Sequence, residues 1–216
     1  MKLMVAGLVG MLALSGVAHA QSASDESTGF IEGVAQSAFG NVTSQSFGIE
    51  GGVMLAPRIA VIAEFGLVRD AAPKTLGATA QVIASSLTTL QSAAVAYTVK
   101  QPVAFGQVGV RYSIPYSDKL HPYVEVAGGL AKVKRDVKFT VAGTDVTDKL
   151  STTYGIVLGT DLAGTESKLM IGGGGGVVYD ITSSVIFDAG FRFSRVNTDP
   201  SSINVSRIGA GIGVRF

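Results

Sequence analysis

The sequence of 216 residues lacks cysteine and tryptophan, and only 15% of its residues are charged. Without cysteine it has neither a disulfide framework nor a thiolate metal site. The formal net charge of +1 argues against a nucleic-acid partner, because phosphate binding needs an excess of basic side chains. What remains is strongly apolar: 47% of the residues are hydrophobic and the mean hydropathy is +0.40. Such values are high for a soluble protein and argue against disorder.

The N-terminus predicts export. Lys2 precedes an apolar run over residues 3–17, and Ala18-His19-Ala20 has the small-residue pattern of a cleavage site. The run is shorter than the roughly 20 residues of a membrane-spanning helix, so a cleavable signal peptide is the better interpretation. The expected organisation is a signal peptide at 1–20, a short polar lead-in at 21–28 and one domain at 29–216.

After the signal, no stretch of about 18 apolar residues occurs without interruption, and the chain instead alternates. In residues 208–216, Ile208, Ile212 and Phe216 share one face, while glycines and Arg215 take the other. This period of two is typical of β-strands. A soluble sandwich also alternates, but its polar face carries many Lys, Glu and Thr, whereas glycine dominates here. An apolar outside around a polar inside is typical of a transmembrane barrel, which must close because lipid tolerates no open strand edge.

Counting the alternating segments gives about eight strands of roughly ten residues, the length that a tilted strand needs to cross a bilayer. They lie at 29–36, 46–56, 59–70, 102–114, 122–134, 168–181, 185–196 and 204–216. Short and long links alternate between them, as periplasmic turns and extracellular loops do. We therefore predict an all-β fold, a closed, antiparallel, up-and-down, eight-stranded transmembrane β-barrel.

The last four residues, Gly213-Val214-Arg215-Phe216, and the segment Pro122-Tyr123-Val124-Glu125-Val126-Ala127-Gly128-Gly129 carry a resemblance. The chain resembles the small eight-stranded outer-membrane β-barrel proteins of Gram-negative bacteria, the group with the attachment proteins, the opacity proteins, OmpX and the OmpA-type transmembrane domains. The resemblance implies location in the bacterial outer membrane. It also implies that Phe216 is the signal that the barrel-assembly machinery reads during insertion. We expect a monomer.

Parity along the strands assigns a network of charged side chains to the lumen. The interior of an eight-stranded barrel is just wide enough for side chains to fill, and an unpaired buried charge is costly. Acids and arginines should therefore pair there. The expected network consists of Glu32, Glu50, Glu64, Arg111, Glu125, Asp188, Arg192, Arg207 and Arg215, with Asp180 pointing the same way.

Strand adjacency predicts two pairs in this network, Arg111 with Glu125 and Glu32 with Arg215. Arg192 or Arg207 should reach across the lumen to Glu50 and Glu64. Two interpretations stay open for the whole set. It is a charged plug that specifies barrel closure, or it lines a narrow channel for small or hydrophobic molecules.

Four outward-facing cations predict a basic collar near the outer interface: Arg69, Lys132, Lys134 and Arg195. At about 2.5 Å of vertical rise per residue, they lie at the height of the lipid headgroups. Basic side chains there bind lipopolysaccharide phosphates. The alternative is ordinary snorkelling of long cations at the membrane edge.

The sequence offers no catalytic residue, no metal ligands and no cofactor site. Residues 172–176 are consecutive glycines, but the Lys and Ser/Thr of a phosphate-binding loop do not follow. A strip of glycine instead lets opposed long side chains enter a narrow lumen. Serine–histidine catalysis needs a histidine beside the nucleophile. After the signal there is only His121, in an expected periplasmic turn.

The long links 71–101 and 137–166 should carry the specific function, as loops on rigid scaffolds usually do. We expect 71–101 to form a β-arm at 92–99 or to fold back over the mouth, with an amphipathic helix over 80–94 as the alternative. Residues 140–146 and 153–158 should form a raised hairpin, whose edges suit strand addition by a partner. The predicted function is non-enzymatic, an envelope-structural or surface-interaction role of the adhesion type, exerted through these extracellular loops.

Overall fold

A computed structural model describes residues 28–40, 42–159, 162–198 and 202–216. In these ranges eight strands close into a ring. They are β1 (Gly29–Phe39), β2 (Ser44–Ala56), β3 (Ile59–Val68), β5 (Val103–Ser113), β6 (Leu120–Val141), β8 (Gly164–Asp180), β9 (Val185–Val196) and β10 (Ile203–Arg215). The expected signal peptide and most of the lead-in lie outside the described residues.

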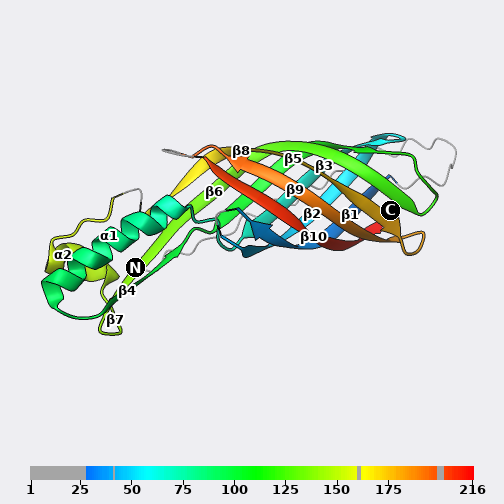
Figure 1. Ribbon diagram of the computed structural model, residues 1–216. Helices are drawn as coiled ribbons and strands as arrows, with labels where there is room; N and C mark the ends of the chain where they lie inside the picture. Colours follow the sequence, from blue (N-terminus) through cyan, green and yellow to red (C-terminus); the bar gives the residue numbers. More distant parts are fainter. Residues whose placement is uncertain (1–27, 41, 160–161, 199–201) are drawn as a thin grey trace, which may run out of the picture.

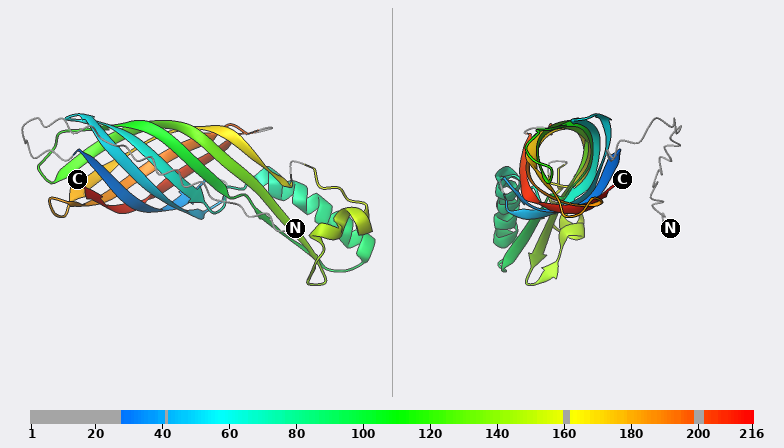
Figure 2. Two further views of the ribbon diagram at one scale, coloured as in Figure 1. Left: turned by 180° about the vertical axis from the view of Figure 1, so that it is seen from behind. Right: turned by 90° about the vertical axis from the view of Figure 1, so that its right-hand side faces the viewer.

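Every barrel strand pairs antiparallel with its neighbours, and the pairing of β6 with β8 closes the ring on one side. On the other side β1 pairs with both β2 and β10. There the N–H of Gly29 donates to the Phe216 carbonyl and the N–H of Phe216 to the Gly29 carbonyl, both at 2.9 Å. Seen end-on, the strands form a continuous ring (Figure 2). The predicted eight-stranded, up-and-down barrel is confirmed.

Many large apolar side chains of the barrel point outward, although an apolar cluster that includes Phe105, Val133 and Met170 is buried inside it. Phe65 is 66% exposed and Ile212 is 62% exposed, while alternate residues such as Glu64 and Arg207 are buried. Aromatic side chains are also exposed near the end of the barrel that holds the C-terminus, namely Tyr112, Tyr179, Phe187 and Phe216. An apolar outer face around buried charges fits a barrel surrounded by lipid.

A second body, which we call the lobe, projects from the other end of the barrel (Figure 1). It contains α1 (Lys74–Gln91), β4 (Val95–Lys100), β7 (Thr144–Asp145), the 3-10 helix η1 (Thr147–Lys149) and α2 (Leu150–Tyr154). β4 and β7 both pair with the outer part of β6, which continues beyond the ring. Neither α-helix in the described ranges is long and apolar enough to span a membrane.

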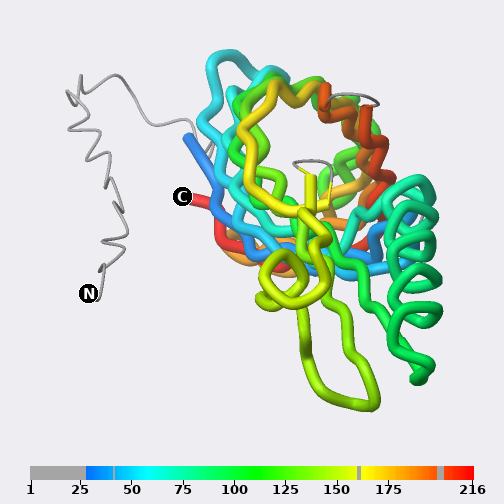
Figure 3. Tube along the Cα trace, turned by 90° about the vertical axis from the view of Figure 1, so that its left-hand side faces the viewer, coloured from blue at the N-terminus to red at the C-terminus, as the bar shows by residue number. Residues whose placement is uncertain are grey.

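The lobe has an apolar core of its own, in which Leu76 and Leu87 of α1 pack with Phe139 of β6 and Leu150 of α2. Spacings of three and four between Leu76, Ala80, Ala84 and Leu87 put the buried residues of α1 on one helical face. Viewed from its own end, the lobe lies to one side of the ring (Figure 3). It does not fold back over the mouth.

The long links agree with the expectations only in part. In 71–101 the helix and the β-arm, expected as alternatives, are both present with shifted bounds: α1 spans 74–91 rather than 80–94, and β4 spans 95–100 rather than 92–99. Residues 153–158 are not a strand, because α2 ends at Tyr154 and Gly155 has a φ of +68°. The hairpin instead lies within residues 140–146, where Val141 of β6 pairs with Thr144 of β7.

Candidate functional site

Two arginines and two glutamates form a closed ring of ion pairs in the lumen: Glu50, Arg111, Glu125 and Arg192. The Arg192 guanidinium lies 2.7 Å from Glu125 Oε1 and 2.9 Å from Glu50 Oε2. Arg111 Nη2 lies 2.8 Å from Glu125 Oε2 and also pairs with Glu50. The expected Arg111–Glu125 pair is therefore present, and Arg192 reaches Glu50 from a strand that does not neighbour β2.

Arg207 forms a second centre in the lumen. Its Nη1 lies 2.6 Å from Glu64 Oε1, and its guanidinium carbon lies 4.5 Å from the centre of the Phe105 ring. Arg207 also donates to Gln36 Oε1 at 3.3 Å. Because β10 and β3 are not neighbours in the sheet, this pair also crosses the lumen. Both partners are buried, so the pair occupies space that a pore would need.

Tyr123 and Asp188 extend the first ring of ion pairs. The Tyr123 hydroxyl lies 2.9 Å from both carboxylate oxygens of Asp188, and the Arg111 guanidinium carbon lies 3.9 Å from the centre of the Tyr123 ring. Glycines of β8 leave room for these groups. A Cβ at Gly176 would lie 2.7 Å from Tyr123 Oη, and one at Gly174 would lie 3.1 Å from Arg192 Cγ. The glycine run therefore admits large side chains, as expected.

The expected pair of Glu32 with Arg215 is wrong. In the register between β1 and β10, Arg215 stands opposite Phe30 and Glu32 stands opposite Gly213. Arg215 Nη1 instead lies 2.9 Å from Asp180 Oδ2. The Glu32 carboxylate is buried, and among the described residues it has no hydrogen-bond partner.

His121 also differs from its expected place in a solvated turn. It is the second residue of β6, and its Nε2 lies 2.9 Å from the same oxygen of Asp180 that binds Arg215. His121 and Arg215 therefore contact one carboxylate at the barrel end that holds the C-terminus. In the described part of the chain, no group of three or more His, Cys, Asp or Glu residues is arranged to hold a metal ion.

The four cations of the expected collar are all exposed: Arg69, Lys132, Lys134 and Arg195. Arg69 donates to Gln45 Oε1 at 2.7 Å, and Arg195 donates to Ser202 Oγ at 3.1 Å. Lys134 lies 3.9 Å from Asp136. They belong to β6, to β9 and to the residue after β3, so they are spread around the rim and do not form one cluster.

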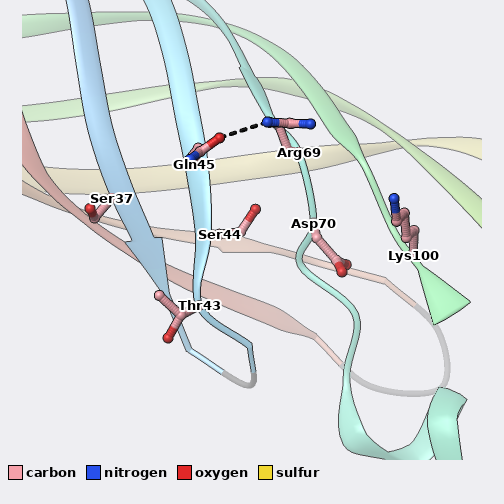
Figure 4. A pocket seen from close by; sticks show the side chains of 7 residues that line it. All are labelled: Ser37, Thr43, Ser44, Gln45, Arg69, Asp70 and Lys100. Carbon is pink, nitrogen blue, oxygen red and sulfur yellow. Dashed lines mark hydrogen bonds between the residues drawn. The ribbon is translucent and has the colours of Figure 1, made fainter. Parts of the chain in front are cut away.

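The structure adds a pocket that sequence reasoning did not identify. It has a volume of about 400 Å³ and lies beside the ends of β1, β2, β3 and β4 (Figure 4). The residues that line it are Ser37, Thr43, Ser44, Gln45, Arg69, Asp70 and Lys100. Parity marked Arg69 as an outward cation. Nothing in the sequence places Lys100 beside it, because a helix and a strand lie between the two residues.

No protein-family model and no curated protein matches the sequence. Solved structures of small outer-membrane barrels do match the fold. Neisserial surface protein A has a TM-score of 0.53 at 13% identity, over 87% of this chain and 96% of that chain. The N-terminal barrel domain of Pseudomonas aeruginosa OprF has a TM-score of 0.48 at 15% identity, over 87% and 96%. Ail of Yersinia pestis has a TM-score of 0.46 at 15% identity, over 87% and 97%.

Proposed function

Since the chain has the fold of the small eight-stranded outer-membrane β-barrels, we propose that it is a non-enzymatic protein of the bacterial outer membrane that presents the lobe at the cell surface. The observation that carries this proposal is that one chain combines a barrel with a charge-filled lumen and a lobe with an apolar core of its own. The barrel holds the lobe in place, and the lobe makes the contacts. Its role is then envelope-structural or adhesive.

The lumen supports a plug rather than a channel. Arg192 links β9 to β2 and β6, and Arg207 links β10 to β3. These side chains are 3% and 1% exposed. Buried ion pairs resist separation, because breaking one pair leaves a buried charge without a partner of opposite sign, and this is costly. A channel through the same space would require these pairs to separate.

Planar-bilayer recording tests the plug. We expect no steady conductance from the wild-type protein, and none from Arg58→Ala, a control at the exposed turn between β2 and β3. Arg192→Ala/Arg207→Ala should give at most brief openings, because the remaining side chains still fill the bore. A large steady wild-type conductance would instead support the narrow channel for small or hydrophobic molecules.

The surface role is tested by removing the lobe. Residues 72–100 and 136–163 are replaced by short glycine–asparagine turns, and intact cells are assayed on a panel of immobilised matrix proteins and glycans. We expect wild-type cells to bind at least one probe and the lobe-deleted cells to lose that binding while the barrel still inserts. Binding that survives the deletion, or no binding to any probe, contradicts an adhesive role and leaves an envelope-structural one.

Export and assembly complete the proposal. The Phe216 ring is exposed at the end of β10, where a binding partner can reach it during insertion. We expect Phe216→Ala to lower the yield of inserted barrel, measured as the protease-resistant fraction in isolated outer membranes. N-terminal sequencing of the mature protein should begin at Gln21 if residues 1–20 are removed. Normal insertion of the Phe216 variant would exclude this role for the ring.

A further inference from the structure

The pocket beside the ends of β1, β2 and β3 is built on one row of outward-facing polar residues. Ser37 and Gln45 stand opposite each other in the register between β1 and β2. The backbone N–H of Arg69 donates to the Gln45 carbonyl at 2.9 Å, which continues the row onto the end of β3. All three residues are exposed. Figure 4 shows their side chains around the pocket.

The next outward rows of the same strands are apolar. Ala35, Phe47 and Leu67 stand opposite one another immediately below the polar row. The row after that contains Ile49 and Phe65, and these large side chains are exposed. On β2 and β3 the change from apolar to polar within one row marks the edge of the lipid-facing surface, while on β1 and β10 the exposed Phe39 and Ile208 extend the apolar surface to this height. The pocket therefore lies at the height of the lipid headgroups.

Its two cations are available to an anion. The Arg69 guanidinium is held by Gln45 Oε1 at 2.7 Å, and because this acceptor is a neutral amide the positive charge is not cancelled. Within the described residues, no carboxylate lies within 4.0 Å of the Arg69 or Lys100 nitrogen atoms. Asp70 also lines the pocket, but its Oδ1 accepts the N–H groups of Ala72 and Gln101, both at 3.0 Å. That oxygen fixes the links to α1 and β5.

The remaining lining groups suit a sugar. Ser37, Thr43 and Ser44 supply hydroxyls that both donate and accept, and Gln45 supplies an amide N–H₂. A volume of about 400 Å³ falls within the range of roughly 300–1,000 Å³ that small-molecule sites occupy. An arginine and a lysine recognise the oxygens of a phosphate monoester through charge-assisted hydrogen bonds. The set therefore matches one sugar unit that carries phosphate.

We propose that this pocket binds a phosphorylated sugar. The ligand comes either from the headgroup of a glycolipid in the outer leaflet or from a soluble sugar phosphate, and the position beside the apolar rows favours the headgroup. The proposal rests on the proposed membrane location, and it narrows the expected lipopolysaccharide contact from a collar to one pocket. Of the collar residues only Arg69 belongs to it.

The first arm of the test uses soluble ligands. Protein in uncharged detergent is titrated with glucosamine 1-phosphate and followed by ³¹P NMR, and glucosamine 6-sulfate and glucosamine are added as competitors that should displace the phosphate less well. The test variant is Arg69→Gln/Lys100→Gln, and the matched control is Lys132→Gln/Arg195→Gln, which removes two rim cations outside the pocket. We expect the test variant to weaken phosphate binding at least about tenfold, since it loses two charge-assisted contacts. The control should change it less than about twofold.

The second arm uses lipid. The same proteins are placed in nanodiscs that contain lipid A with its phosphates or lipid A treated with phosphatase, and retained lipid is counted by native mass spectrometry. Retention of phosphorylated lipid A that is lost in the test variant assigns the site to a headgroup. Binding of the soluble sugar phosphate alone assigns it to a free ligand.

Two results would overturn the proposal. One is the absence of binding in both arms. The other is an equal loss of phosphate or lipid binding in the test and control variants. That result would mean that the net positive charge of the rim, and not this pocket, attracts the ligand. Circular dichroism of each variant shows whether the barrel is folded. The lobe deletion also removes Lys100 of this pocket, but it measures binding to surface probes rather than to lipid. Failure of the pocket proposal in the two arms above therefore leaves the lobe-deletion result to be judged separately.

Discussion

The barrel and the lobe are built around the same strand, but among the described residues only the barrel buries charged side chains beside its apolar ones. β6 runs through both, and every buried residue of the strand is odd-numbered, in the barrel as in the lobe. In the barrel this face carries Glu125, which pairs with arginines in the lumen. In the lobe it carries Val137 and Phe139, which pack under α1. The backbone pattern is unchanged, while the buried face of β6 changes from charged at Glu125 to apolar at Ala131, at Val133 and in the lobe.

The difference follows from what surrounds each body. Apolar side chains gain little by leaving lipid, so the barrel can turn them outward and fill its bore with paired charges. A lobe in water gains about 25 cal/mol for each Å² of apolar surface that it buries. Alternation within a strand therefore shows that its two faces differ. It does not show which face meets water.

The largest effect should come from removing a lumen arginine. Arg192→Met leaves Glu50 and Glu125 with one arginine between them, and the loss of a buried partner costs about 3–5 kcal/mol. Urea unfolding in detergent micelles, followed by far-UV circular dichroism, measures the change in the free energy of unfolding.

Arg195→Met is the matched control, because Arg195 lies on the same strand and faces outward. It should change the free energy of unfolding by less than about 0.5 kcal/mol. Equal effects at both positions would mean that the lumen pairs do not stabilise the barrel.

A comparable loss confined to the lobe is expected for Leu87→Ala. Leu87 is 0% exposed in the lobe core, and truncation of a buried leucine costs about 2–5 kcal/mol. Amides of α1 and β4 should exchange hydrogen faster, while those of β9 and β10 keep their protection. Leu90→Ala, at a position that is 61% exposed, should leave exchange unchanged. If the barrel amides lost protection too, the two bodies would be one cooperative unit.

How much could be foreseen from the sequence differs between the two bodies. Most barrel strands alternate with a period of two, so the sequence places the ends of seven strands within four residues of those observed. The exception is β6, which runs seven residues beyond the predicted end at 134 and into the lobe. The helix α1 lacks the usual signals. Its N-cap is Pro73 without a side-chain hydrogen bond, and its first turn has no acid and its last turn no base. With those signals absent, the spacing of Leu76, Ala80 and Leu87 was hard to separate from alternation.

The site shows the same limit in another form. Parity gives the face of a side chain but not its height, because a shift in register moves partners along the strand. Arg111 and Glu125 stand directly opposite each other and were paired correctly. Glu32 and Arg215 share a face but not a register position, so Asp180 takes the arginine. The pocket at Arg69 forms because the link that contains α1 brings Lys100 back beside β3. The alternation of the strands gives no information about the course of that link.

A smaller effect is expected at the hairpin between β6 and β7. Ala142 and Gly143 have φ values of +48° and +82°, which is the backbone of a two-residue turn that favours glycine or asparagine. Ala142→Gly should therefore stabilise the lobe by at most about 1 kcal/mol. Gly143→Ala should destabilise it by a similar amount. Hydrogen exchange at the outer end of β6 measures both changes. If the amides there lost protection in Ala142→Gly, the positive φ of Ala142 would not be a source of backbone strain.

The smallest effect contrasts a carboxylate in water with those in the lumen. Asp145 is exposed, and the hydroxyl and N–H of Thr147 hold its pKa below the ordinary value of 3.8. A lowered pKa in the folded lobe means that ionised Asp145 adds stability above about pH 4, and that this contribution is lost as the pH falls through the lowered pKa. Thr147→Val removes the hydroxyl donor, so carboxyl ¹³C NMR should find the Asp145 pKa closer to its ordinary value. An unchanged pKa in that variant would show that the backbone N–H alone sets it. Glu50 and Glu125 are buried and each pairs with two arginines, whereas Asp145 is stabilised by two neutral donors and the solvent.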